Sequence, residues 1–410
     1  MIDNNTIFTL SNGLRVIHKQ VDRPIAHCGI MINAGTRDEQ EHEQGIAHFI
    51  EHAIFKGTKK RKAYHILNRL DSVGGEIDAY TTKETTCIYG SFLPEYYDRT
   101  IDLISDIILN SQFPEKEIEK EKEVVLDEIN VYLDSPSDQI YDDFEAQVFK
   151  NHALGNPILG TAESVKSFNK EAIMGFIRRN YTTSNMVFSS VGNISPNRLK
   201  NKLEKYFSGL DSAASNLNRV PFIPNGGIKV KLKKDTFQTH CIFGKAAYGA
   251  NNPNRVGLIL LNNILGGPAM NSILNLKIRE KYGFTYNIES NYSIYTDCGL
   301  FSIYLASDPK FMEKCVNAVL KELKLLRNKK LSPAKLHSSK QQLKGQLAIS
   351  RESNSNIMLS NAKNLLCYNR IDSLETIHRK IDAISADEIL NIAAENLDPS
   401  FFDYLYFEGK

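Results

Sequence analysis

Two histidines and a glutamate lie within a short apolar segment, residues 45–57, which reads GIAHFIEHAIFKG. His48 and His52 are four residues apart, and Glu51 directly precedes the second histidine. On a helix, positions i and i+4 share one face, so two such imidazoles can bind one zinc ion at about 2.0–2.1 Å. A carboxylate beside them can take a proton from a water molecule that the metal has made acidic. The pattern indicates a catalytic metal site; the alternative is a buried helix that tolerates a few polar residues.

A catalytic zinc ion needs three protein ligands and one open position, so a third ligand must come from another segment. The best candidates lie in residues 114–133, PEKEIEKEKEVVLDEINVYL, a long charged helical pattern. Glu121 and Glu128 are seven residues apart there, which places both on one helical face. Charged residues on such a helix are usually solvated and without function. The histidine pair favours a functional role for one of these glutamates, because it leaves one coordination place to fill.

The elements that position these residues occur twice in the chain. Each copy opens with an extended apolar segment around a His-Cys pair, continues through a polar turn and an apolar helical pattern, and is followed by strands and helices. The matching stretches begin at residues 25 and 238. We therefore expect an α+β fold with two homologous domains, residues 1–215 and 216–410, each a mainly antiparallel sheet with helices packed on it. The join is expected in residues 210–228, which are rich in Ser, Asn, Pro and Gly.

The duplication provides an internal control for the histidines. If Gly45 matches Gly257, then Leu260 and Ile264 stand in the second copy where the two histidines stand in the first. The fold itself therefore does not require histidine at these places. We expect only the first domain to bind metal.

Composition excludes several other classes of function. The net charge of +2 over 410 residues gives no reason to expect a nucleic acid, an anionic membrane or an acidic substrate. The six cysteines are scattered, with no C-x-x-C pair, which favours buried thiols in a reducing compartment. No secretory pattern and no apolar run of about 20 residues is visible. These observations predict a cytoplasmic protein without a membrane partner.

The metal motif has the H-x-x-E-H form of the inverzincins, and the chain resembles the pitrilysin, insulysin and mitochondrial-processing-peptidase family. The resemblance runs from Leu10 to the C-terminal helices and includes the flanking segments AGTRDE, HAIFKGT and GGEIDAYTTKETT. The family's third ligand is a glutamate at the spacing of Glu128, which lies 76 positions after His52. The resemblance implies one zinc ion per chain held by His48, His52 and Glu128. It also implies Glu51 as the general base and Glu121 as a residue that orients or assists.

The resemblance assigns a role to the second half as well. The family keeps an arginine and a tyrosine seven apart in its metal-free half, and Arg279 and Tyr286 match them. The tyrosine would stabilise negative charge on the scissile carbonyl oxygen, and the arginine would hold a peptide carbonyl or carboxylate. The alternative is an exposed helical arginine and a strand tyrosine without a role.

Peptide binding is expected on an edge strand of the first half. Asp78, Ala79 and Tyr80 match the family strand that receives an extended peptide by strand addition. The family often has asparagine where this chain has Asp78. An ionised aspartate accepts hydrogen bonds but cannot donate one, so the contact made at this position differs.

The resemblance implies a zinc endopeptidase that hydrolyses unstructured peptides or short protein segments. Each chain would form half of a clamshell, and a homodimer would enclose the chamber, because one chain carries both the metal set and the Arg279–Tyr286 pair. The alternative is a catalytically silent or processing-partner subunit of a peptidase-like complex; such relatives typically lose part of the metal motif, which this chain keeps. General peptide clearance and maturation of one dedicated peptide remain open.

Overall fold

The computed structural model describes residues 5–212 and 217–410. The chain forms two compact units. Unit 1 contains residues 1–130, 156–219 and 349–373; unit 2 contains residues 131–155, 220–348 and 374–410. The expected boundary between residues 215 and 216 lies outside the described residues. Two short segments, 131–155 and 349–373, belong to the unit formed mainly by the other half of the sequence, which the sequence pattern did not indicate.

Unit 1 is built on a six-stranded sheet with the order β1-β2-β6-β3-β5-β4. Its strand pairs are antiparallel except for the parallel pair of β2 and β6. Strand β4 lies at one edge and pairs with β5. The strands are β1 (Asn5–Thr9), β2 (Arg15–Gln20), β3 (Ala26–Ile32), β4 (Glu76–Thr81), β5 (Thr86–Phe92) and β6 (Met186–Gly192).

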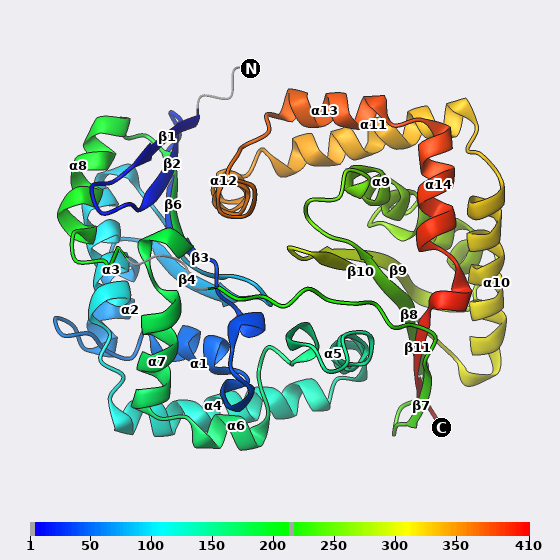
Figure 1. Ribbon diagram of the computed structural model, residues 1–410, viewed down its shortest axis with the longest axis horizontal. Helices are drawn as coiled ribbons and strands as arrows, with labels where there is room; N and C mark the ends of the chain where they lie inside the picture. The colour runs from blue at the N-terminus through cyan, green and yellow to red at the C-terminus, as the bar shows by residue number, and fades with distance from the viewer. Residues whose placement is uncertain (1–4, 213–216) are drawn as a thin grey trace. The chain divides into compact units, whose positions relative to one another are not determined.

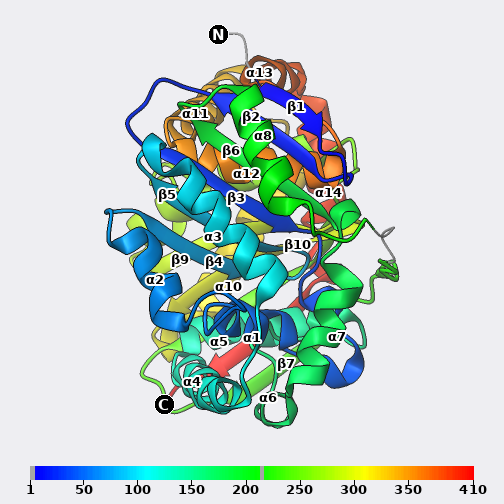
Figure 2. The same ribbon diagram turned by 90° about the vertical axis from the view of Figure 1, so that its left-hand side faces the viewer.

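Most helices of unit 1 cover one face of this sheet, and α12 covers the other (Figure 1). The two faces follow from the alternation of side chains along each strand. In β3, Ile30 and Ile32 enter the core shared with α1, α3, α7 and α8, whereas Met31 packs with α12. Figure 2 looks onto the first face, with α3 in front of the strands. The helices are α1 (Ile46–Ala53), α2 (Ala63–Asp71), α3 (Tyr97–Asn110), α4 (Glu115–Leu133), α6 (Ala162–Ser167), α7 (Lys170–Asn180), α8 (Pro196–Phe207) and α12 (Asn354–Tyr368).

Unit 2 repeats this plan on a five-stranded sheet with the order β7-β11-β8-β10-β9. Phe243 and Phe301 enter the core with α9, α10 and α14, while Ile242 and Leu300 face α5. The strands are β7 (Lys229–Lys233), β8 (Thr239–Tyr248), β9 (Thr285–Ile294), β10 (Cys298–Ser307) and β11 (Asp403–Glu408). The helices are α5 (Pro136–Val148), α9 (Arg255–Gly266), α10 (Pro309–Asn328), α11 (Pro333–Ser350), α13 (Leu374–Ala383) and α14 (Ala386–Asn396), with a π-helix at Asn275–Glu280.

The two halves of the sequence exchange one helix each. Helix α12 follows α11 in the second half but packs on β3 and β6 of unit 1, where the hydroxyl of Ser189 donates a hydrogen bond of 2.7 Å to the carbonyl of Met358. Helix α5 follows α4 in the first half but packs on β8 and β11 of unit 2, where the amide of Gln147 donates to the carbonyl of Ile228. Each sheet therefore buries its second face with a helix from the other half.

The expected α+β class with two sheet-and-helix units is confirmed. In the part of the chain that the structure describes, every helix is too short or too polar to cross a lipid bilayer.

Candidate metal centre

Helix α1 carries the two histidines and is held firmly at its start. Gly45 has φ of +89°, and a Cβ there would lie 2.6 Å from the backbone of Gly160, so only glycine fits. The carboxylate of Glu39 accepts hydrogen bonds from the N–H groups of Gly45 and Ala47, each 2.9 Å long, and so caps the first turn. The apolar face of α1 is buried in the core of unit 1: Ile46, Ala47, Phe49, Ile50 and Ala53. These contacts fix the direction in which the opposite face presents its polar side chains.

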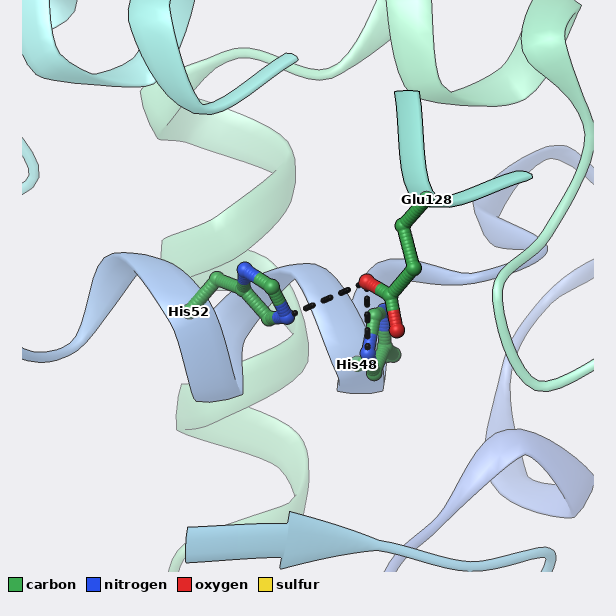
Figure 3. Close-up of side chains that lie close together, drawn as sticks. All are labelled: His48, His52 and Glu128. Carbon is green, nitrogen blue, oxygen red and sulfur yellow. Dashed lines mark ion pairs between the residues drawn. The ribbon is translucent and has the colours of Figure 1, made fainter. Parts of the chain in front are cut away.

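His48, His52 and Glu128 converge on one point (Figure 3). Oε2 of Glu128 lies 3.7 Å from Nε2 of His48 and 3.5 Å from Nε2 of His52. Ligands about 2.0–2.1 Å from a tetrahedral zinc ion lie about 3.3 Å from one another, so these separations suit such an ion. Oε2 of Glu128 is buried and has no hydrogen-bond partner among the described residues. An unpartnered buried carboxylate oxygen facing two imidazole nitrogens fits a metal ion, and we conclude that this donor set can hold zinc.

The two imidazoles have different electrostatic surroundings. Burial lowers the pKa of His48 to about 3, and the neighbouring His52 acts in the same direction. The hydrogen bond with Glu121 raises the pKa of His52, and the charge of Glu128 contributes to this rise. His48 is therefore held neutral, which is the form that ligates metal, and both carboxylates favour positive charge at His52.

Glu121 lies directly behind His52. It is buried, and its Oε1 lies 3.0 Å from Nδ1 of His52 while its Oε2 lies 2.7 Å from Nζ of Lys56. Burial alone would raise the pKa of Glu121, but the hydrogen bonds with His52 and Lys56 outweigh it, and the pKa is lowered. Because Nδ1 faces Glu121, Nε2 of His52 faces Glu128. The structure thus places Glu121, for which the family resemblance implies a role that orients or assists, against His52; Lys56 was not predicted.

Glu51 stands beside the cluster of three without belonging to it. Burial raises the pKa of Glu51, a hydrogen bond with Thr81 of β4 opposes this, and the charges of Glu128 and Asp78 raise it further. Oε2 of Glu51 is buried and has no hydrogen-bond partner among the described residues. A carboxyl group with a raised pKa and a free oxygen can hold and release a proton.

The expected peptide-binding residues Asp78, Ala79 and Tyr80 lie on β4, which is an edge strand of the sheet. The carboxylate of Asp78 accepts hydrogen bonds from the hydroxyl of Tyr89, at 3.0 Å, and from the N–H of Ala79, at 2.8 Å. A peptide added to this edge would compete with Asp78 for the N–H of Ala79. Strand β4 also contacts α1, so the edge and the metal cluster belong to one unit.

Arg279 and Tyr286 belong to unit 2 and lie against each other. Arg279 is in the π-helix, and its guanidinium carbon lies 4.6 Å from the centre of the Tyr286 ring. Tyr286, in β9, is 80% exposed. The residues expected to replace the histidines in the second copy, Leu260 and Ile264, are buried in the core on α9. Over the described residues, His48, His52 and Glu128 form the one cluster that could hold a metal ion.

Two family models match the chain. A family model described as "Insulinase (Peptidase family M16)" matches residues 15–162, which contain the whole metal cluster. A second model, described as "Peptidase M16 inactive domain", matches residues 167–343, which contain Arg279 and Tyr286.

Relatives extend over nearly the whole chain. The zinc protease YmxG of Bacillus subtilis is 33% identical over 392 residues, covering 95% of this chain and 94% of the relative. A zinc protease of Rickettsia felis is 34% identical over 394 residues, covering 96% and 95%. The names of both relatives call them uncharacterized zinc proteases.

Two solved structures share the fold. A protease from Helicobacter pylori has a TM-score of 0.92 at 20% identity and covers 99% of this chain and all of its own length. A structure described as a peptidase M16 inactive domain from Pseudomonas fluorescens has a TM-score of 0.92 at 17% identity, covering 99% and 98%. At these identities the likeness concerns the fold.

Proposed function

The chain belongs to the insulinase family of peptidases, M16, and from this premise we propose that it is a zinc-dependent endopeptidase that hydrolyses unstructured peptides or short protein segments. The observation that carries the proposal is the convergence of His48, His52 and Glu128, with Glu51 beside them. A catalytically silent subunit has no need for a complete ligand set next to a carboxyl group of raised pKa. The names of the relatives support zinc as the metal.

The three converging side chains would hold one zinc ion per chain. When bound, zinc supplies Lewis acidity, which makes a water molecule easier to deprotonate and polarises a carbonyl group. Glu51 would receive the proton that the attacking water loses and would pass it to the leaving amine. Its burial suits both steps, because a raised pKa brings proton uptake and release closer to neutral pH.

The remaining site residues would bind and orient the peptide. Strand β4, with Asp78, Ala79 and Tyr80, would pair with an extended segment, which would favour unstructured chains as substrates. The hydroxyl of Tyr286 would donate a hydrogen bond to the carbonyl oxygen as negative charge develops there, and Arg279 would hold a neighbouring peptide carbonyl or carboxylate. The exposure of Tyr286 supports a role in contact with another molecule.

Two further proposals concern the working assembly and its location. A homodimer would supply the Arg279–Tyr286 pair of one chain to the zinc site of the other. A cytoplasmic location is supported by the cysteines of the described residues, which are thiols rather than disulfides and are buried except for Cys367.

Metal analysis joined to peptide cleavage tests the proposed function. The purified full-length protein should contain one zinc ion per chain and should cleave members of a library of unstructured peptides. A chelator should abolish cleavage, and added zinc should restore it. A protein that retains zinc but cleaves no peptide would instead support the silent-subunit alternative.

A further inference from the structure

Lys56 is joined to the metal centre through one intervening side chain. Its ammonium lies 2.7 Å from Oε2 of Glu121, and Oε1 of the same carboxylate lies 3.0 Å from Nδ1 of His52. Both oxygens of Glu121 are therefore engaged, one by a candidate metal ligand and one by a residue in the turn that follows α1. Glu121 is 3% exposed, so water has little access to replace either partner.

The backbone around Lys56 is tied to the segment that leads into α4, the helix of Glu121. The N–H of Gln112 donates a hydrogen bond of 3.0 Å to the carbonyl of Gly57, and the N–H of Lys59 donates one of 2.9 Å to the carbonyl of Asn110. Lys56 itself donates its N–H to the carbonyl of Ala53, which continues the turn of α1. The backbone of Lys56, from which its side chain extends, is therefore fixed relative to both α1 and α4.

The residues that directly follow Lys56 are held in place by charged side chains of α3. The hydroxyl of Thr58 donates to Asp106 at 2.7 Å, and Arg61 forms ion pairs with Asp106 and Asp102. Asp106 is fully buried. This anchoring holds the backbone from which the Lys56 side chain extends, and the Glu121 side chain is only 4% exposed, so the contact differs from an ion pair between two exposed side chains.

We propose that Lys56 is a positioning residue of the metal centre: by binding Oε2 of Glu121 it holds the carboxylate in the orientation in which Oε1 accepts the Nδ1–H of His52, so that His52 presents Nε2 to the metal ion. A buried carboxylate with one partner can turn about its terminal bond, whereas one with two charge-assisted hydrogen bonds cannot. Partners of this kind behind a ligating histidine set both its tautomer and its ring orientation. The inference rests on the proposed zinc site.

The predicted effect lies in zinc affinity. Removing groups that orient metal ligands typically weakens metal binding about 10–100-fold. Because Lys56 acts through Glu121, we expect Lys56→Met to weaken zinc binding about tenfold, which is the lower end of this range. Lys56→Arg, which keeps a donor of the same charge, should retain most of the affinity. Lys60→Met is the matched control, because Lys60 is exposed and four positions away.

A double-mutant cycle separates action through Glu121 from a general structural effect. If Lys56 works only by holding that carboxylate, Lys56→Met should cost little further affinity in a Glu121→Gln background. A residue that merely stabilised the fold would weaken binding by the same factor in both backgrounds. The free energy of unfolding of each metal-free variant shows whether it folds, and Lys56→Gln replaces Lys56→Met if the latter does not.

The experiment is a competition between a zinc chelator and the full-length protein, repeated with cobalt, whose visible spectrum reports the coordination geometry. We expect weaker zinc binding and an altered cobalt spectrum for Lys56→Met, wild-type behaviour for Lys60→Met, and no additivity with Glu121→Gln. Equal zinc affinity of Lys56→Met and wild type, or full additivity in the cycle, would overturn the inference while leaving the zinc site in place. If the wild-type protein itself binds no zinc, the proposed function fails instead.

Discussion

Oε2 of Glu128 lies 3.5 Å from Nε2 of His52, although 76 positions separate the two residues in the sequence. The contact exists because α4 runs past the polar face of α1, and both helices are seated in the core of unit 1 through residues such as Val125 and Ile50. Two turns earlier on α4, Glu121 reaches the other nitrogen of the same imidazole. One helix therefore supplies both the candidate ligand Glu128 and the carboxylate that contacts the neighbouring candidate ligand His52.

Replacing Glu128 by glutamine should strongly weaken zinc retention. The amide keeps the size of the side chain but removes the charge and is a much poorer zinc ligand than a carboxylate. Metal analysis after dialysis against a weak chelator measures the loss, and Glu123→Gln, an exposed glutamate on the same helix, is the control. Unchanged zinc content and affinity in Glu128→Gln would remove Glu128 from the ligand set.

The exchange of helices predicts that the N-terminal half does not fold alone. A fragment of residues 1–219 lacks α12, so the sheet face formed by Ile17, Met31 and Val187 would be exposed to water. We expect this fragment to aggregate or to show no cooperative unfolding transition. Joining residues 349–373 to it through a flexible linker should restore cooperative unfolding, measured by circular dichroism in urea. Cooperative unfolding of the fragment 1–219 without α12 would show that this packing is dispensable.

Subunit complementation tests the proposed homodimer. Glu51→Gln and Tyr286→Phe chains should each be nearly inactive, because one lacks the base and the other the carbonyl donor. If one chain supplies Tyr286 to the zinc site of its partner, mixed dimers should regain activity at one of their two sites. Two outcomes would exclude a shared site: no recovery in any mixture of folded chains, or full activity in a strictly monomeric protein.

The spacing of the histidines predicted that His48 and His52 share one helical face, and the structure brings both together with Glu128, which the family resemblance had implied as the third ligand. Spacings of four residues on α1 and seven on α4 place side chains on single faces whatever the rest of the fold does. The pattern of hydrophobic residues likewise predicted two sheets with helices, and this expectation is confirmed.

The features that the sequence did not predict depend on long-range packing. The apolar faces of α5 and α12 indicate that each helix packs on another element, but the periodicity does not indicate which sheet it covers. Both helices cover the sheet formed by the other half of the sequence. Lys56 looks like one of several lysines in the run after α1, and only the three-dimensional arrangement places its ammonium on Glu121. Arg279 lies in the π-helix and Tyr286 lies in β9, and the turn between these elements brings the guanidinium against the ring. A spacing of seven residues does not reveal this contact.

The most direct test of the central claim is the Glu51→Gln variant, with zinc content and peptide cleavage measured on the same preparation. Glu51 stands beside the three converging side chains without being one of them, so its amide should leave metal binding and folding intact. Removing a general base should lower the cleavage rate about a hundredfold or more. The account predicts one zinc ion per chain together with this loss of rate. Wild-type cleavage by Glu51→Gln at full zinc occupancy would contradict it.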